Sequence, residues 1–407
     1  MFNSYSSVRL INSQPILLFL IMLKNEVAEK SHRLQSIDLL RGLIMIVMAL
    51  DHVREFFSYT SYRPTDVTQT SVLLFFTRWV THLCAPTFVF LSGISIFLYS
   101  KKIGSLKKTS AFLLTRGLWL IAVEIFVISF ILTQGYQLTL LEVIWAIGCS
   151  MILLAGLIWL PRWIQIILAL AMIFGHDAFP LVGMASNDNM LLAFLHNSPF
   201  FISSPPVLVA YTIIPWVAVM LLGYVVGAWF NYLPQTRDKL LLRVGVSALL
   251  LFVALRFLNI YGDPSPWSTQ ERGSIYTFLS FMNVSKSPPS LLFLSVTLGI
   301  ACILLMLLNK ISTGVKQVFI TYGRVPFFFF IVHLAVISFA AHVWTYISFG
   351  KAVNLSFEKP KDWPAAYQPN LIRAYFVWLL LIVLLYFPCK WYGKYKAKSN
   401  AWWVSYL

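Results

Sequence analysis

Charged residues are scarce in this sequence, and their scarcity excludes most soluble folds. Only 11% of the 407 residues are Asp, Glu, Lys or Arg, whereas 59% are hydrophobic, and the mean hydropathy is +0.76. A soluble domain of this length needs more surface charge, whereas apolar helices of about 20 residues satisfy their own backbone groups inside a bilayer. The sequence therefore predicts an all-α polytopic membrane protein.

Acidic residues and cysteines are also few. The 15 acidic residues are outnumbered by 31 basic ones, which gives a formal net charge of +16. The basic residues follow alternate apolar segments, so membrane topology explains the charge and no nucleic-acid partner is expected. The cysteines lie in apolar runs without metal or redox spacing, which favours buried structural thiols. They are Cys84, Cys149, Cys302 and Cys389.

Hydropathy predicts about ten membrane-spanning segments. Basic residues precede the first segment and follow the second, fourth, sixth, eighth and last, whereas the alternate loops are poor in them or mixed in sign. By the positive-inside rule, both termini are predicted to be cytoplasmic. The predicted segments are residues 36–57, 73–99, 112–133, 139–160, 162–179, 207–230, 240–260, 288–309, 318–345 and 371–391.

The expected domain organisation is simple. An N-terminal extension, residues 1–32, precedes a transmembrane domain, residues 33–395, and a cytoplasmic tail, residues 396–407. The extension contains the apolar run PILLFLIML, which is shorter than a typical membrane-spanning helix. It also lacks the small-residue signature of a signal-peptide cleavage site.

Three long loops fall on the predicted outer side of the membrane. Residues 180–206, 261–287 and 346–370 are rich in Pro, Ser, Asn and Trp, as in SSPPV, GDPSPWS and KDWPAAYQPN. Such loops serve either as plain connectors or as a cap over an external site. Their length and aromatic content favour the cap.

The first segment, RLQSIDLLRGLIMIVMALDHVREFF, carries several charges inside an apolar helix. Each charge near the bilayer centre costs about 2.5–3.5 kcal/mol on insertion scales, so this helix is more than an anchor. Arg41, Met45, Met48 and His52 recur at helical spacing and share one face. With a rise of about 1.5 Å per residue, Arg41 and His52 lie about 16 Å apart along the axis. This face is the candidate active face, with Arg41 inward and His52 outward.

The dyad of Asp51 and His52 is the strongest candidate for chemistry. Imidazole suits proton transfer near neutral pH, and a neighbouring carboxylate can hold its tautomer. Adjacent helical side chains point about 100° apart, so contact within the dyad is not implied, and Arg41 or His82 is an alternative neighbour. Lone membrane histidines such as His176 are more often packing residues, and arginines near helix ends often reach toward headgroups.

Several stretches carry a family resemblance. SIDLLRG followed by MALDHVREFF resembles the catalytic region of the heparan-α-glucosaminide N-acetyltransferase family and its bacterial relatives. FFTRWVTHLCAPTFVFLSGISIFLY, RGLWLIAVE, EVIWAIGCSMILLAGLIWLP, and KSPPSLLFLSVTLG with YGRVPFFFFIVHL extend it from about Leu34 to His342. A looser pattern, D-x-L-R-G and then a histidine a helix length later, is similar to membrane acyltransferases that O-acetylate surface polysaccharides.

The resemblance implies an acyl-CoA-dependent O- or N-acetyltransferase in a bacterial inner membrane. It would move an acetyl group from cytosolic acetyl-CoA to a glycan or other small acceptor at the outer face. His52 falls where lysosomal members carry an active-site asparagine and where polysaccharide acetyltransferases carry a histidine. The catalytic histidine of the lysosomal members, before the second span, has no clear counterpart here, and His82 matches a different position. The resemblance therefore does not identify the acetyl acceptor.

Roles for the polar residues follow from this chemistry. His52, assisted by Asp51 and His82, is expected to deprotonate the acceptor, with His333 as a second polar group. The pantetheine arm would run along the Arg41–Met48 face, and both direct transfer and an acetyl-histidine intermediate fit. No metal is expected, because no histidine and carboxylate set has ligand spacing. The residues expected to bind the CoA phosphates are Arg41, Arg116, Lys101, Lys102, Lys107 and Lys108.

Two other function classes fit part of the sequence. A proton-coupled secondary transporter or exporter would also place Asp, His and Arg at intermediate depth, although no internal repeat is obvious. A non-catalytic scaffold would explain the hydrophobic bulk but not the aligned face from Arg41 to His52. Membrane lipids are expected partners, and the oligomeric state stays open, a homo-oligomer included.

Overall fold

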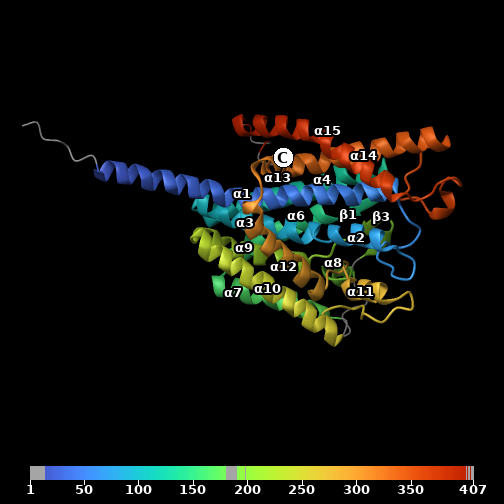
Figure 1. The fold of residues 1–407 in the computed structure, drawn as a ribbon, viewed down its shortest axis with the longest axis horizontal. Helices are drawn as coiled ribbons and strands as arrows, with labels where there is room; N and C mark the ends of the chain where they lie inside the picture. Colours follow the sequence, from blue (N-terminus) through green and yellow to red (C-terminus); the bar gives the residue numbers. More distant parts are fainter. Residues whose placement is uncertain (1–13, 180–189, 198, 400, 402–403, 405–407) are drawn as a thin grey trace, which may run out of the picture.

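Long helices that run roughly side by side make up most of the chain (Figure 1). The computed structural model describes residues 14–179, 190–197, 199–399, 401 and 404, and describes side chains of the first helix from Gln35 onward. Parts of the expected extension, of the 180–206 loop and of the tail therefore lie outside the described residues. The helices are α1 (Gln14–Phe57), α2 (Val72–Thr81), α3 (Cys84–Ile103), α4 (Leu106–Val123), α5 (Ser129–Thr133), α6 (Val143–Leu157), α7 (Arg162–Gly175), α8 (Met190–Leu195), α9 (Ile214–Gly227), α10 (Pro234–Leu258), α11 (Ser274–Met282), α12 (Leu291–Leu307), α13 (Thr313–Gly323), α14 (Pro326–Phe349) and α15 (Leu371–Lys398).

A small sheet departs from the expected all-α fold. It joins β1 (Thr139–Leu141), β2 (Phe200–Ser203) and β3 (Pro206–Val209) in the order β1-β3-β2. β1 and β3 are parallel, and β2 and β3 are antiparallel. The sheet occupies the starts of two predicted spans, residues 139–160 and 207–230, so α6 and α9 begin later than hydropathy predicts.

Six helical segments of the described chain are long and apolar enough to cross a membrane. They are Val72–Ile103, Leu106–Thr133, Ile214–Asn231, Pro234–Leu258, Pro326–Phe349 and Leu371–Lys398, while α6 and α12 are shorter apolar helices. The remaining predicted segments coincide with α1 and α7. The protein is thus a mostly helical integral membrane protein.

Two predicted spans are broken helices. Residues 73–99 divide into α2 and α3 at His82 and Leu83, and residues 318–345 divide into α13 and α14 at Arg324 and Val325. Pro326 opens α14, and a proline disfavours helical backbone in the residue before it, which explains the extended φ of −130° at Val325. The breaks bring polar side chains to the ends of short helices inside the apolar region.

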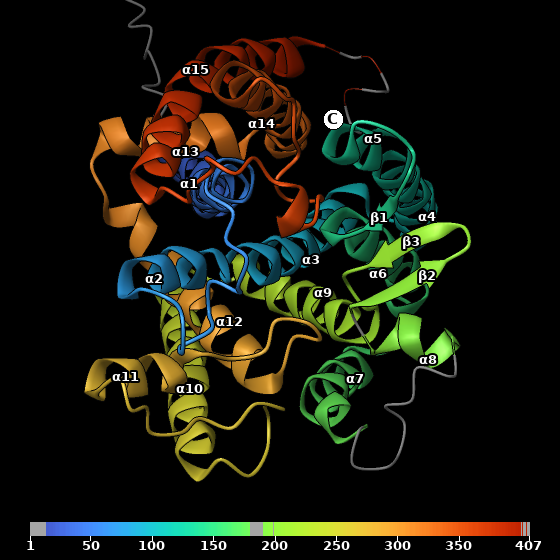
Figure 2. The same cartoon turned by 90° about the vertical axis from the view of Figure 1, so that its right-hand side faces the viewer.

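Helix α1 lies beside α13, α14 and α15 on one side and α3 on the other (Figure 2). The closest pairings are α3 with α9, α10 with α12, α4 with α6, and α1 with α13. Glycines permit the last of these, because a Cβ atom at Gly42 would overlap the carbonyl of Phe319. The candidate active helix is therefore held at backbone contact distance.

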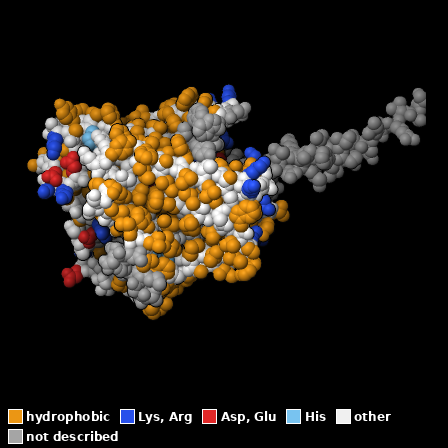
Figure 3. All heavy atoms as spheres, turned by 180° about the vertical axis from the view of Figure 1, so that it is seen from behind, with side chains coloured by type: hydrophobic (Ala, Val, Ile, Leu, Met, Phe, Trp, Pro, Cys, Tyr) orange, Lys and Arg blue, Asp and Glu red, His pale blue; other side chains and the backbone are white. Residues whose placement is uncertain are grey.

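The two ends of the molecule differ in charge. Figure 3 shows a broad hydrophobic band, with Lys and Arg gathered at the end from which α1 projects and both signs of charge at the other end. At the first end, Lys101 and Lys102 lie in the last turn of α3, and Lys107 and Lys108 lie in the first turn of α4. We call these four residues the loop lysines, since they flank the α3–α4 loop. We call the end from which α1 projects the basic end and the opposite end the mixed end.

The α1–α13 contact makes a stability prediction. Gly42→Ala should lower the free energy of unfolding by about 1–3 kcal/mol, because the added methyl group pushes two helix backbones apart. Gly156→Ala in α6 is the matched control, since its Cβ would meet nothing within 4 Å. Thermal unfolding in detergent measures both variants. Equal midpoints would contradict the close contact.

Candidate active site

A cavity of about 1070 Å³ opens at the mixed end. We call it the loop-side cavity, because residues from the α1–α2, α11–α12 and α14–α15 connections line it. All three long loops predicted to form a cap contribute, with Pro199, Lys286 and Glu358 among the lining residues. Hydrogen bonds from the Thr68 side chain and backbone lower the pKa of the Asp66 carboxyl, which keeps this rim residue anionic.

A second cavity, of about 400 Å³, reaches inward from the basic end. We call it the basic-side cavity. Its wall is mainly apolar, but Arg41, Arg116, Arg324 and Lys396 lie on it. The basic-side cavity therefore joins a cationic mouth to an apolar interior.

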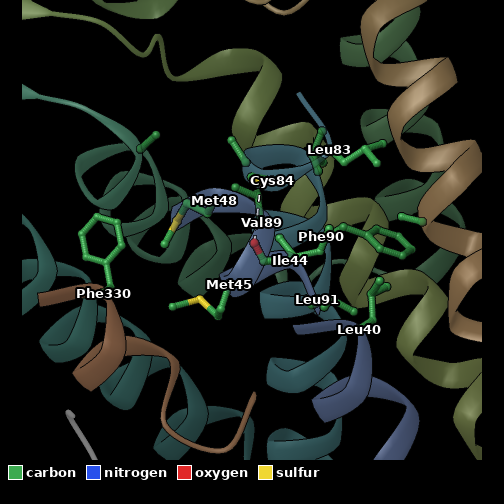
Figure 4. Close-up of a cluster of buried hydrophobic side chains, with 14 of the residues drawn as sticks. Leu40, Ile44, Met45, Met48, Leu83, Cys84, Val89, Phe90, Leu91 and Phe330 are labelled. Carbon is green, nitrogen blue, oxygen red and sulfur yellow. Dashed lines mark hydrogen bonds between the residues drawn. The ribbon is translucent and has the colours of Figure 1, made fainter. Parts of the chain in front are cut away.

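The two cavities share four lining residues, Met48, Phe88, Val143 and Phe330. We call these four residues the neck. Figure 4 shows Met45 and Met48 projecting from α1 toward the side on which Phe330 lies. Met45 lines only the basic-side cavity and His52 only the loop-side cavity, so the predicted face of α1 passes from one to the other.

His52 is hydrogen-bonded to His333 of α14, 281 positions away in sequence. The His52 Nδ1 to His333 Nε2 distance is 2.8 Å, and the two rings are stacked with centroids 5.0 Å apart. His333 is fully buried, and its Nδ1 lies 2.8 Å from the carbonyl oxygen of Phe329. Sequence reasoning named both histidines but did not pair them.

These contacts determine the tautomer of each neutral ring. A carbonyl only accepts, so His333 Nδ1 carries the proton and His333 Nε2 is an acceptor. His52 Nδ1 must then donate to His333, which leaves His52 Nε2 with its lone pair. His52 lines the loop-side cavity, and its Nε2 has no hydrogen bond to any described residue. The pair thus presents an unprotonated nitrogen just beyond the neck.

Asp51 is engaged elsewhere. Its Oδ2 accepts a 2.6 Å hydrogen bond from Arg78, and its Oδ1 accepts from the Arg54 side chain at 3.0 and 3.3 Å. Arg54 is 2% exposed and also pairs with Glu55. Asp51 therefore orders the buried Arg54 and the partly buried Arg78 at the cavity wall, and it is not hydrogen-bonded to the His52 ring. Neither Arg41 nor His82 is the hydrogen-bond partner of His52.

Three further polar groups face the loop-side cavity. His82 ends α2, is 5% exposed and has no hydrogen-bond partner for Nδ1 in the described structure. Glu142 lies just before α6, where the buried Glu124 carboxylate accepts a hydrogen bond from its backbone N–H at 3.0 Å. Lys286 lies in the α11–α12 loop with its Nζ 5.5 Å from the Tyr211 ring. Glu142 and Lys286 were not predicted as site residues, because no local pattern reports that the start of α6 and the α11–α12 loop line the same cavity.

At the other end, the predicted cations have distinct roles. Arg41 donates to Asp38 at 3.2 Å, to the Gly323 carbonyl at 3.2 Å and to Ser95 at 2.9 Å, which ties α1 to α13 and α3. Arg116 of α4 also lines the basic-side cavity. Arg324 at the α13–α14 break and Lys396 in α15 complete the group and were not predicted as site residues.

The four predicted loop lysines are set apart from this group. Lys101, Lys102, Lys107 and Lys108 do not line the basic-side cavity. Lys101 lines a different cavity of about 620 Å³ between α3, α4, α7 and α9. Within the described chain, no group of three or more His, Cys, Asp or Glu side chains is placed to hold a metal ion.

Comparison with known proteins connects this geometry to a family. The family model described as heparan-alpha-glucosaminide N-acetyltransferase, catalytic, matches residues 33–262, which is more than half of the chain. The matched region contains α1 from Arg33 onward, with Arg41 and His52, and the neck residues Met48, Phe88 and Val143. No curated protein matches the chain. The chain belongs to the heparan-α-glucosaminide N-acetyltransferase catalytic family and is a membrane acetyltransferase.

Proposed function

We propose that the protein transfers the acetyl group of cytosolic acetyl-CoA to a sugar-like acceptor at the outer face of the membrane. The observation that carries the proposal is the meeting of two cavities at an apolar neck, with His52 on the loop-side wall. In this arrangement the basic end is cytoplasmic, both termini lie on that side, and about ten segments cross a bacterial inner membrane.

The donor binds through the basic-side cavity. Arg41, Arg116, Arg324 and Lys396 meet the phosphates at the cavity mouth, where charge-assisted hydrogen bonds are strong. The loop lysines add positive potential that attracts the coenzyme from solution. The pantetheine arm follows the apolar wall along Met45 and Met48 and presents the thioester at the neck.

The acceptor binds in the loop-side cavity. His52 Nε2 takes the proton from the acceptor hydroxyl or amine as its oxygen or nitrogen attacks the thioester carbonyl. The tetrahedral intermediate collapses with cleavage of the C–S bond, and the imidazolium returns the proton to the CoA thiolate. Arg78, ordered by Asp51, provides positive charge for the developing oxyanion. His82 is a further polar contact for the acceptor.

His333 acts through His52. Its acceptor nitrogen holds the proton on His52 Nδ1, so the nitrogen that faces the acceptor is the basic one. The hydrogen bond also stabilises the imidazolium that forms during transfer.

Removal of the base tests the proposal directly. His52→Ala should lower the kcat for acetyl transfer by about 10²–10⁴-fold, because proton removal from the acceptor is lost. Acetyl-CoA hydrolysis and transfer by purified protein, with and without a panel of sugars, measure the effect. A wild-type protein that neither binds acetyl-CoA nor is stabilised by it would contradict the acyltransferase. Proton-driven solute flux without acetyl-CoA binding would support the transporter instead.

The hydrogen bond between His52 and His333 leads to a separate prediction. His333→Phe leaves His52 Nδ1 without its acceptor and should lower kcat by about 10²-fold with an unchanged KM for acetyl-CoA. His333→Gln is the matched variant, because its side-chain oxygen can accept the same hydrogen bond, and it should keep more activity. Equal activity of the two variants would show that His333 serves packing alone.

The donor site is tested with charge-neutral variants. Arg324→Gln combined with Lys396→Gln should raise the KM for acetyl-CoA by about tenfold or more, since each charge-assisted hydrogen bond contributes about 1.5–3 kcal/mol. This increase in KM should be smaller at high salt, because salt screens the charge interactions that the variant removes. Lys390→Gln is the control, because Lys390 is exposed on the same helix and does not line the cavity. An unchanged KM would remove these two residues from the donor site.

A further inference from the structure

The third cavity, of about 620 Å³, is separate from the two cavities of the proposed acetyl transfer and shares no lining residue with either. It lies at the basic end between α3, α4, α7 and α9. Lys101 and Arg162 are its cationic residues, and no Asp or Glu is among the described residues that line it. We call it the Lys101 pocket.

Backbone dipoles add to this positive character. Ser105 and Leu106 at the start of α4 line the pocket, as does Arg162 at the start of α7. Helix N-termini carry partial positive charge and exposed N–H groups, and neither helix has an acidic residue in its first turn. Two helix starts and two cations therefore converge on one cavity, which favours an anion.

Polar donors complete the wall. Asn231 and Tyr232, which follow α9, line the pocket, as does Tyr224 within α9. The Arg162 guanidinium is steadied by a 3.1 Å hydrogen bond from its Nη2 to the Val225 carbonyl, and Lys101 Nζ lies 5.8 Å from the Phe97 ring. Both cations keep donors for a ligand, because each of these contacts occupies only part of the charged group.

The surroundings identify the membrane as the source of the anion. Exposed aromatic residues border the pocket in sequence, with Trp159 56% exposed, Trp163 62% and Tyr232 43%. Trp and Tyr gather where the bilayer core meets the headgroups. Exposed Leu106 and Leu233 continue the apolar surface beside them. A phosphate held in the pocket would thus have lipid chains against an apolar flank.

We propose that the Lys101 pocket binds the phosphate headgroup of an anionic phospholipid from the cytoplasmic leaflet. Basic pockets between helices on that side are suited to such headgroups. Lys101 and Arg162 bind the phosphate, and Asn231 donates to the headgroup oxygens. The site is separate from the donor and acceptor sites, so it stands whether or not acetyl transfer is observed.

The test compares two lipids and two double variants. Purified protein in detergent is titrated with dioleoyl phosphatidylglycerol or dioleoyl phosphatidylcholine, with native mass spectrometry and thermal unfolding as readouts. Wild type should bind and be stabilised by the anionic lipid preferentially. Lys101→Gln with Arg162→Gln should weaken that binding by at least about tenfold. Lys107→Gln with Lys108→Gln removes the same charge from residues outside the pocket and should keep it.

Further measurements keep the proposal falsifiable. Arg162→Lys retains the charge and should retain the lipid preference, which covers the case in which the double variant fails to fold. Equal binding of both lipids by wild type overturns the proposal, as does an equal loss in the Lys107 and Lys108 variant. Inorganic pyrophosphate that stabilises the lipid-free protein as strongly as phosphatidylglycerol would assign the pocket to a soluble phosphate and overturn the lipid.

Discussion

The hydrogen bond between His52 and His333 is the interaction on which the site depends. It joins α1 to α14 beside the neck, and the Phe329 carbonyl at its far end decides which nitrogen carries each proton. Because His333 is fully buried, water does not compete for its two nitrogens, and its protein contacts set the neutral tautomer of the pair. The free nitrogen of His52 then faces the loop-side cavity, next to the place where the basic-side cavity ends.

The rest of the helical framework places this pair at a junction. Backbone contact between α1 and α13 at Gly42 fixes the depth of α1, and Arg41 reinforces it through Gly323 and Ser95. The break between α13 and α14 brings Arg324 to the mouth of the basic-side cavity while α14 carries His333 to the neck. The α13–α14 pair therefore contributes Arg324 to the proposed donor site and His333 to the proposed catalytic site.

Periodicity and hydropathy predicted the helices and the shared face of α1, but not the contacts between residues far apart in the sequence. The shared face from Arg41 to His52 was predictable, because helical spacing depends only on local sequence. Its partner His333 lies 281 positions away, and no local pattern reports such a contact. The same limit applies to Asp51, whose carboxylate accepts a hydrogen bond from Arg78 of another helix and none from its neighbour His52. The loop lysines lie outside the basic-side cavity for a similar reason. The sequence shows that they are charged, but it does not show which cavity their side chains line.

In the proposed mechanism, acetyl-CoA enters from the basic end and delivers its thioester to the neck beside His52. Electron cryomicroscopy of His52→Ala with saturating acetyl-CoA tests it most directly, because loss of the base slows turnover and retains the donor. Density for the phosphates is expected among Arg41, Arg116, Arg324 and Lys396, with the acetyl group at Met48 and Phe330. Coenzyme density confined to the loop-side cavity, or an empty basic-side cavity at saturation, would contradict it.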